Sequence, residues 1–248
     1  MHATIQKTID EILDMLKGED KVFVVGCGNC AAKCKSGGEP ETKEMCRRLE
    51  ERGKTVTGWA VSVGSLCVLS DTKKMLNSEH RAAVEMADSI LVLACGQGVH
   101  TVIDATGKIV HPGCNTIFGG ETLGIGDNIT INEYCSLCGE CIAEFTGGLC
   151  PLTLCSKGLL NGPCGGAVDG KCEVDKERDC GWNLIYERLK QIGKLDNLYE
   201  YQEPKDYSKW SRPRRLNLVN GRPIFKSVSG EYSPFDKDVG GCKTDETH

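Results

Sequence analysis

Residues 22–34 read VFVVGCGNCAAKC, an unbroken apolar run that leads into three closely spaced cysteines. A short run of β-branched and aromatic residues that ends at glycine is typical of a strand buried on both faces of a parallel sheet. The cysteines follow the strand directly, in C-x2-C-x3-C spacing. Because the carboxyl ends of parallel strands form the ligand crevice of an open sheet, this stretch predicts both the sheet and a thiol-rich site at its edge.

Segments with helical and strand-like periodicity alternate on either side of this stretch. We expect helices at 4–17, 39–52 and 71–86 and a short one after Gly98, and strands at 22–25, within 56–63, at 90–94 and near 109–110. This β-α-β rhythm indicates the α/β class, with a doubly wound parallel sheet of the Rossmann or flavodoxin-like kind.

The composition changes near Tyr134 to short segments punctuated by Cys and Gly, and periodicity returns only at Trp182. Such a region has little core of its own, so bound metal has to stabilise it. We therefore expect an α/β domain at 1–130 with one Cys site, a Cys-rich, ferredoxin-like cluster domain at 131–202 that ends in a helix, and an extended tail at 203–248.

Composition and charge exclude several classes of protein. Of the 248 residues, 40% are hydrophobic and 26% charged, and the formal net charge is -5, which argues against nucleic acid as the main partner. No apolar run is long enough to span a bilayer, and acidic residues interrupt the N-terminal apolar stripe, so neither membrane insertion nor a signal peptide is expected. These features favour the reducing environment of the cytoplasm.

The chain has 16 cysteines, which is too many for all of them to be catalytic nucleophiles. It is also too long to be a mini-protein stabilised by disulfides. In a reducing compartment such a number favours metal clusters. The first group is Cys27, Cys30 and Cys34, with Cys95, which ends another predicted strand, as the fourth thiol. Cys67 is a rival fourth ligand, and the glycines flanking Cys27 and Cys95 would let the backbone pass close to a ligand.

A second group lies in residues 135–151, CSLCGECIAEFTGGLCP. The C-x2-C-x2-C run followed by Cys-Pro resembles the ferredoxin pattern, although the last gap is longer. Cys135, Cys138 and Cys141 are therefore expected to bind one iron–sulfur cluster. Cys150 either completes that cluster or joins another.

The third group is a quartet of further cysteines: Cys155, Cys164, Cys172 and Cys180. Four thiols suffice for one more four-iron cluster, and the GPCGG stretch around Cys164 can donate backbone N–H groups to sulfur. Structural zinc, which also takes four cysteines, remains the alternative for this quartet. No nucleotide-binding motif and no nucleophile–base pair appears, so no catalytic residue is expected.

Several motifs together resemble one known family: VFVVGCGNCAAKCKSGG, LVLACGQGV, CSLCGEC, CPLTLCSKGLLNGPCGG and DGKCEVD followed by DCGWNLIYERL. The chain is similar, from about Val22 to Arg215, to the iron–sulfur (MetV-type) small subunit of bacterial methylenetetrahydrofolate reductase. All twelve cysteines of the three groups, and Cys67, match cysteine positions of that family.

The resemblance implies two to three [4Fe-4S] clusters, with zinc in one four-cysteine site as an option. It also implies a partner, the catalytic subunit, which carries the flavin and binds the folate. Electrons would pass through the clusters to that flavin in one-carbon metabolism of anaerobes, such as the Wood–Ljungdahl (reductive acetyl-CoA) pathway. A ferredoxin or a further complex would supply them. The alternative is a zinc-stabilised assembly module without a redox role.

Overall fold

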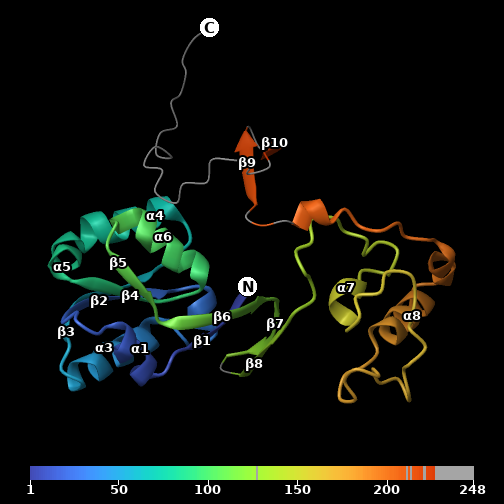
Figure 1. The fold of residues 1–248 in the computed structure, drawn as a ribbon, viewed down its shortest axis with the longest axis horizontal. Coiled ribbons are helices and arrows are strands. Elements are labelled where there is room, and N and C mark those ends of the chain that lie inside the picture. The colour runs from blue at the N-terminus through green and yellow to red at the C-terminus, as the bar shows by residue number, and fades with distance from the viewer. Residues whose placement is uncertain (127, 211, 213, 220–221, 227–248) are drawn as a thin grey trace, which may run out of the picture. The chain divides into compact units, whose positions relative to one another are not determined.

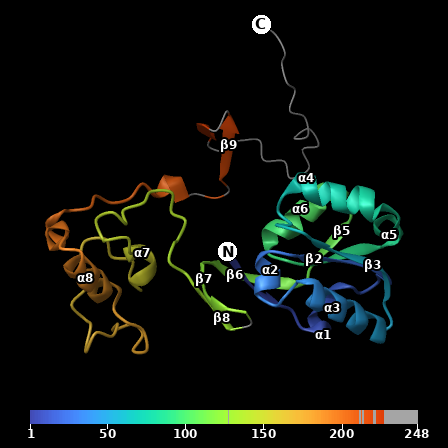
Figure 2. The same ribbon diagram turned by 180° about the vertical axis from the view of Figure 1, so that it is seen from behind.

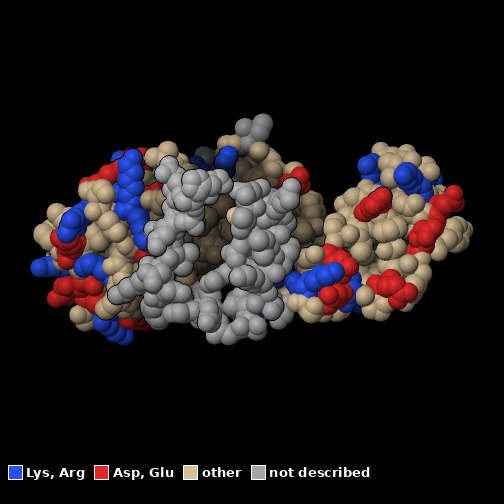
Figure 3. Space-filling view, turned by 90° about the horizontal axis from the view of Figure 1, so that it is seen from above, with Lys and Arg blue, Asp and Glu red and all other residues tan. Residues whose placement is uncertain are grey.

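The computed structural model describes residues 1–126, 128–210, 212, 214–219 and 222–226 (Figure 1). Two compact units divide the chain, one from Met1 to Gly120 and one that begins at Glu121. None of the described helices combines the length and the apolar character that a bilayer crossing requires. On the face drawn in Figure 3, Lys and Arg side chains are interspersed with Asp and Glu.

A four-stranded parallel sheet forms the centre of the first unit, as predicted. Its strands are β2 (Lys21–Cys27), β3 (Thr55–Ser62), β4 (Ser89–Leu93) and β5 (Ile109–Pro112). They lie in the order β3, β2, β4, β5, and every pairing is parallel. β2 is central and almost wholly buried, which explains its unbroken apolar run.

Helices cover both faces of this sheet (Figures 1 and 2). Those on one face are α1 (Ile9–Met15) and α3 (Glu39–Glu51), and those on the other are α4 (Leu69–Lys74), α5 (Arg81–Met86) and α6 (Gly96–Thr106). A short helix, α2 (Cys30–Lys33), follows β2. The unit is therefore doubly wound, as the β-α rhythm predicts.

Alternate residues of the central strands divide the core between the two faces. Phe23 packs in a buried cluster with Leu76 and Val102, whereas Val24 packs in a second cluster with Leu49. All of these side chains are fully buried. Because burying one large apolar side chain contributes roughly 1.5–3 kcal/mol, the sheet has a strong core independent of any metal.

The predicted helix over 4–17 is wrong at its start. His2–Gln6 form a strand, β1, which pairs antiparallel with β6 (Cys114–Gly119). Ile5, which the helical pattern places on the buried stripe, is 62% exposed. Pairing with a strand more than a hundred residues away therefore overrides the local periodicity.

α1 begins only after this strand, at a well-formed cap. The Thr8 hydroxyl accepts from the Glu11 N–H at 3.3 Å, and the Glu11 carboxylate accepts from the Thr8 N–H at 2.8 Å. This reciprocal capping box satisfies N–H groups that the first turn leaves unpaired. The helix ends near Gly18 (φ 85°), as the sequence predicts.

The helix predicted from Asp71 to Met86 is present but divided. α4 begins two residues before Asp71, and a π-helical turn, η1 (Met75–Glu79), separates it from α5. Leu76 within the turn is fully buried, and Asn77 Nδ2 donates to the Ala105 carbonyl at 2.8 Å. The extra residue of the π turn thus fits these two side chains against the core and α6.

The second unit has less regular structure. It opens with an antiparallel hairpin of β7 (Glu121–Ile125) and β8 (Asn128–Asn132). Between residues 133 and 180, the described chain holds one short helix, α7 (Pro151–Leu154), and two isolated bridges. α8 (Gly181–Gln191) follows, and the buried cluster around it consists of Cys180, Trp182, Ile185 and Leu189.

A 3-10 helix, η2 (Leu195–Tyr199), follows α8. Beyond it, the described part of the tail expected at 203–248 contains local structure. A 3-10 turn, η3 (Tyr207–Trp210), precedes an antiparallel hairpin of β9 (Arg215–Val219) and β10 (Arg222–Lys226). Cys242 lies outside the described residues.

Candidate metal centres

The first group of cysteines lies where the sheet reverses its winding. From β2 the chain steps to β3, then crosses back past β2 to β4 and continues to β5. Cys27 ends β2, and Cys95 lies two residues after the end of β4, which pairs with β2. Both cysteines therefore lie at the topological switch point, where open sheets bind ligands.

Cys67 belongs to the same neighbourhood. Partial burial raises the pKa of its thiol, and the nearby thiols of Cys95, Cys27 and Cys30 raise it further. Only groups a short distance apart influence one another in this way. Cys67 and Cys95 therefore both remain candidate ligands, because both lie near Cys27 and Cys30.

Cys34 lies near the N-terminal strand and near Cys114, which also lies near Cys95. Its Sγ donates to the His2 carbonyl at 3.6 Å. Burial raises the pKa of Cys114 to about 12 and outweighs the opposing hydrogen bond to Ser36, and the thiols of Cys34 and Cys95 add to the rise. Cys114, which belongs to none of the predicted groups, thus lies beside Cys34 at the start of β6.

Two glycines of this site are required by packing within the protein. A Cβ at Gly28 would overlap the Ser62 carbonyl on the neighbouring strand, and Gly26 has equally little room. At Gly96, in contrast, the nearest atom to such a Cβ would be 4.0 Å away. Packing against the protein therefore requires Gly26 and Gly28, and it fixes where Cys27 leaves the sheet.

In the second unit, loops turn their backbone N–H groups toward sulfur. The Leu137 N–H donates to Cys135 Sγ at 3.4 Å, and the Gly166 N–H donates to Cys164 Sγ at 3.4 Å. The turn at Cys135 contains Leu137 at φ 55°, and the turn at Cys164 contains Gly165 at φ 80°. Hydrogen bonds to cysteine sulfur support metal-bound thiolates and tune cluster potentials.

Two thiols of this unit are shifted toward their ionised form. Hydrogen bonding to the Ser156 hydroxyl, and next to the backbone of Val174, lowers the pKa of Cys172. For Cys138, partial burial opposes ionisation, but the backbone of Glu140 and the Lys205 ammonium together lower the pKa. Because the thiolate is the metal-binding form, both environments favour ligation.

Close packing of two helices brings Cys155 and Cys180 of the third group together. Cys155 ends α7, Cys180 caps α8, and Cys155 packs against the buried cluster that contains Cys180. A Cβ at Gly181 would lie 2.5 Å from the Leu154 backbone, so glycine is needed for this approach. Cys172 Sγ lies 3.6 Å from the hydroxyl of Ser156, the neighbour of Cys155.

Cys150 is tied to the loop of the second group. The Thr153 hydroxyl donates to the Tyr134 carbonyl at 3.1 Å and to the Cys150 carbonyl at 3.3 Å. Tyr134 directly precedes Cys135, so the start of α7 lies beside the loop of residues 135–141. Cys150, at the start of α7, is therefore close along the chain to a direct contact with this loop.

Within the described residues, no three His, Cys, Asp or Glu side chains are arranged to hold a single metal ion. A single zinc ion with bonds of about 2.3 Å to sulfur draws its ligands close together. A four-iron cluster is bound through four different irons, so its thiolates stand farther apart. Thiols are soft ligands, the donor set that both zinc and iron–sulfur clusters take.

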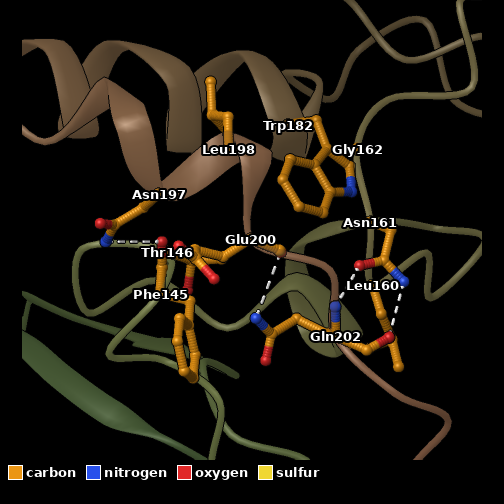
Figure 4. Close-up of a pocket in the computed structure, with 10 residues that line it drawn as sticks. All are labelled: Phe145, Thr146, Leu160, Asn161, Gly162, Trp182, Asn197, Leu198, Glu200 and Gln202. Atoms are coloured by element: carbon orange, nitrogen blue, oxygen red, sulfur yellow. Dashed lines mark hydrogen bonds between the residues drawn. The ribbon is translucent and has the colours of Figure 1, made fainter.

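A small cavity next to α8 is enclosed by side-chain amides and aromatic rings (Figure 4). The Asn161 side-chain amide donates to the Gln202 backbone carbonyl at 2.9 Å and accepts from the Gln202 backbone N–H at 2.7 Å. The Trp182 indole donates to the Leu159 carbonyl at 3.0 Å. The cavity volume is about 20 Å³, enough for one water molecule. These contacts join the loop before Cys164 to α8 and the segment that follows it.

Comparison with known proteins found one match. A family model described as methylene-tetrahydrofolate reductase C terminal matches residues 111–208, the stretch that holds the second and third cysteine groups and Lys205. Neither the curated proteins nor the solved structures yielded a match. Over this stretch, the chain is similar to the family described as methylene-tetrahydrofolate reductase C terminal.

Proposed function

We propose that this chain is the iron–sulfur subunit of a methylenetetrahydrofolate reductase and passes electrons to a flavin on a separate catalytic subunit. The proposal depends above all on one observation. Thiols from three separate stretches of chain, at Cys27 and Cys30, Cys67, and Cys95, gather where the parallel sheet reverses its winding. The related segment at 111–208 supports the connection to the reductase.

The first site would be built on the rigid end of the sheet. Cys27, Cys30, Cys67 and Cys95 would bind the first cluster, and Cys34 is the competing ligand. Cys27 and Cys95 are 5% and 7% exposed, so their surroundings would exclude water from one side of the group. Burial of this kind shifts cluster potentials.

The second unit would hold the other two groups. Cys135, Cys138, Cys141 and Cys150 would bind one cluster, and Cys155, Cys164, Cys172 and Cys180 a second cluster or zinc. When bound, [4Fe-4S] clusters accept and release single electrons. The chain itself would hold them in place and donate N–H groups to the sulfurs of Cys135 and Cys164.

The partner would be the flavin- and folate-binding catalytic subunit, and a ferredoxin or another electron-donating complex would stand upstream. In the cytoplasm of an anaerobe, this electron transfer would serve one-carbon metabolism, such as the reductive acetyl-CoA pathway. Three exposed tyrosines of the described chain, Tyr199, Tyr201 and Tyr207, support a docking surface on the second unit. Tyrosine is enriched in protein interfaces.

The direct test is anaerobic purification followed by iron and sulfide analysis and by EPR of the dithionite-reduced protein. We expect a brown protein with at least about eight irons per chain, as two four-iron clusters require. Colourless, zinc-containing protein without an EPR signal would reject electron transfer. It would favour the alternative, a zinc-stabilised assembly module of the same complex.

The Cys138→Ala variant tests the ligand assignment. Loss of one ligand should remove about four irons and destabilise the loops at 135–180, because they have little apolar core. Cys242→Ala, in a cysteine outside all three groups, is the control and should retain both the iron and the melting temperature. Unchanged iron in Cys138→Ala would contradict the assignment.

A further inference from the structure

The chain beyond α8 returns to the loop of residues 135–141 and packs on it. The backbone N–H of Asp206 donates to the Glu140 carboxylate at 3.2 Å, and the Lys209 ammonium pairs with the same carboxylate at 3.3 Å. Arg214 donates to the Leu137 carbonyl at 2.8 Å. Lys205, Lys209 and Arg214 therefore form a basic strap over the loop that carries Cys135, Cys138 and Cys141.

Lys205 is the buried member of this basic strap. It is 8% exposed, and its ammonium donates to the backbone carbonyl of Glu140. Among the described residues, no carboxylate lies within 4.0 Å of it, although the ammonium is near enough to the Glu140 carboxyl to help lower its pKa. A buried cation without an ion-pair partner in contact is costly, so the fold holds this charge against a local disadvantage.

The thiol of Cys138 lies beside this charge. Cys138 Sγ donates to the Glu140 carbonyl at 3.3 Å, and the Lys205 ammonium donates to the same oxygen. The two groups are therefore no more than two hydrogen-bond lengths apart. Thiolates of residues 135–141 would supply a second negative neighbour for Lys205.

We propose that Lys205 is a positioning residue for the cluster bound by residues 135–141, and that its buried charge raises the reduction potential of that cluster. This inference rests on the proposed function. Reduction adds one electron, here from dithionite, and no bond forms or breaks. Because the added charge is negative, a nearby cation stabilises the reduced state more than the oxidised state.

The test compares Lys205→Met, Lys205→Arg and Lys209→Met in anaerobically prepared full chain. The readouts are iron content and EPR-monitored redox titration. We expect Lys205→Met to lower the equilibrium constant for reduction of one cluster about tenfold, a shift of about 59 mV to more negative potential. Lys205→Arg should retain the wild-type potential. Lys209, 48% exposed, is the matched control and should shift little.

Two other results have a definite meaning. Loss of about four irons per chain in Lys205→Met, with full iron content in Lys205→Arg, would also support the positioning role. It would mean that a positive charge at this position is enough to keep the cluster bound. Full iron content with unchanged potentials in Lys205→Met would overturn the inference and leave the proposed function intact. A wild-type chain that binds no iron and sulfide would instead reject both.

Discussion

Gly181 permits the helix contact that brings Cys155 and Cys180 together, so Gly181→Ala should damage the third cysteine group. A Cβ at this position would lie 2.5 Å from the carbonyl carbon and oxygen of Leu154, whereas real Cβ contacts stay beyond 3.0 Å. α8 would have to move away from α7 by about 0.5 Å. The obstacle is backbone and cannot rotate aside.

Two effects of this substitution oppose each other. Overpacking in a well-packed region costs about 1–3 kcal/mol, while alanine in place of glycine gains at most about 1 kcal/mol in a helix. We expect the clash to outweigh the helix effect, with a net loss of about 1–2 kcal/mol in the free energy of unfolding. With a urea m-value of about 2 kcal/mol/M, the unfolding midpoint should fall by about 0.5–1 M.

The assay is urea unfolding of the anaerobically reconstituted protein, followed by tryptophan fluorescence that includes the buried Trp182. Iron content measured on the same samples should fall with the stability. Gly64→Ala is the control, because a Cβ there would meet nothing within 4 Å and the midpoint should not change. A Gly181→Ala protein as stable as wild type would refute the reasoning.

Three further predictions follow from the first unit. Cys67→Ala should remove about four irons per chain, whereas Cys34→Ala should retain them, and the opposite result in iron analysis would make Cys34 the ligand. Thr8→Ala removes the cap of α1 and should lower the free energy of unfolding by about 1 kcal/mol in urea titrations, with no effect on iron content. Gly28→Ala should separate β2 from Ser62 on β3 and lower the free energy of unfolding by about 1–3 kcal/mol. The first site should lose its iron as well, and normal iron content would contradict this prediction.

The parallel sheet could be predicted because its information is local. The apolar run of β2 and the helical periodicity of α3 each depend on neighbouring residues, and both elements were confirmed within a residue or two. β1 could not be predicted in this way, because its partner β6 lies more than a hundred residues away. The Thr8 and Glu11 pair was a local sign of where the helix starts.

The candidate site was predictable in type but less so in membership. The C-x2-C-x3-C spacing identifies a thiol-rich strand end, yet spacing cannot show where each thiol points. Cys34 lies near Cys114, a cysteine with no close sequence neighbour, and Cys67 lies near Cys27 and Cys95, of which Cys95 is also near Cys114. Side-chain direction at a sheet edge depends on turns and packing, such as the Gly28 contact, that no pattern of residue types contains.

The two units place their thiols by different physical means, and this difference can be measured. In the first unit, a sheet with two fully buried apolar clusters fixes Cys27 and Cys95 whether or not metal is bound. In the second unit, residues 133–180 have one short helix, and the small buried cluster beside them belongs mainly to α8, so we expect ligand bonds to replace the missing core.

Removal of the metal should therefore loosen the second unit and leave the first one folded. Hydrogen exchange of chelator-treated and reconstituted protein, compared by mass spectrometry, should show protection lost across 133–180 and retained in β2 and β4. Restoring iron and sulfide should restore the protection. Equal protection of 133–180 with and without metal would mean that these loops fold by themselves, and the cysteines there would then need another explanation than cluster ligation.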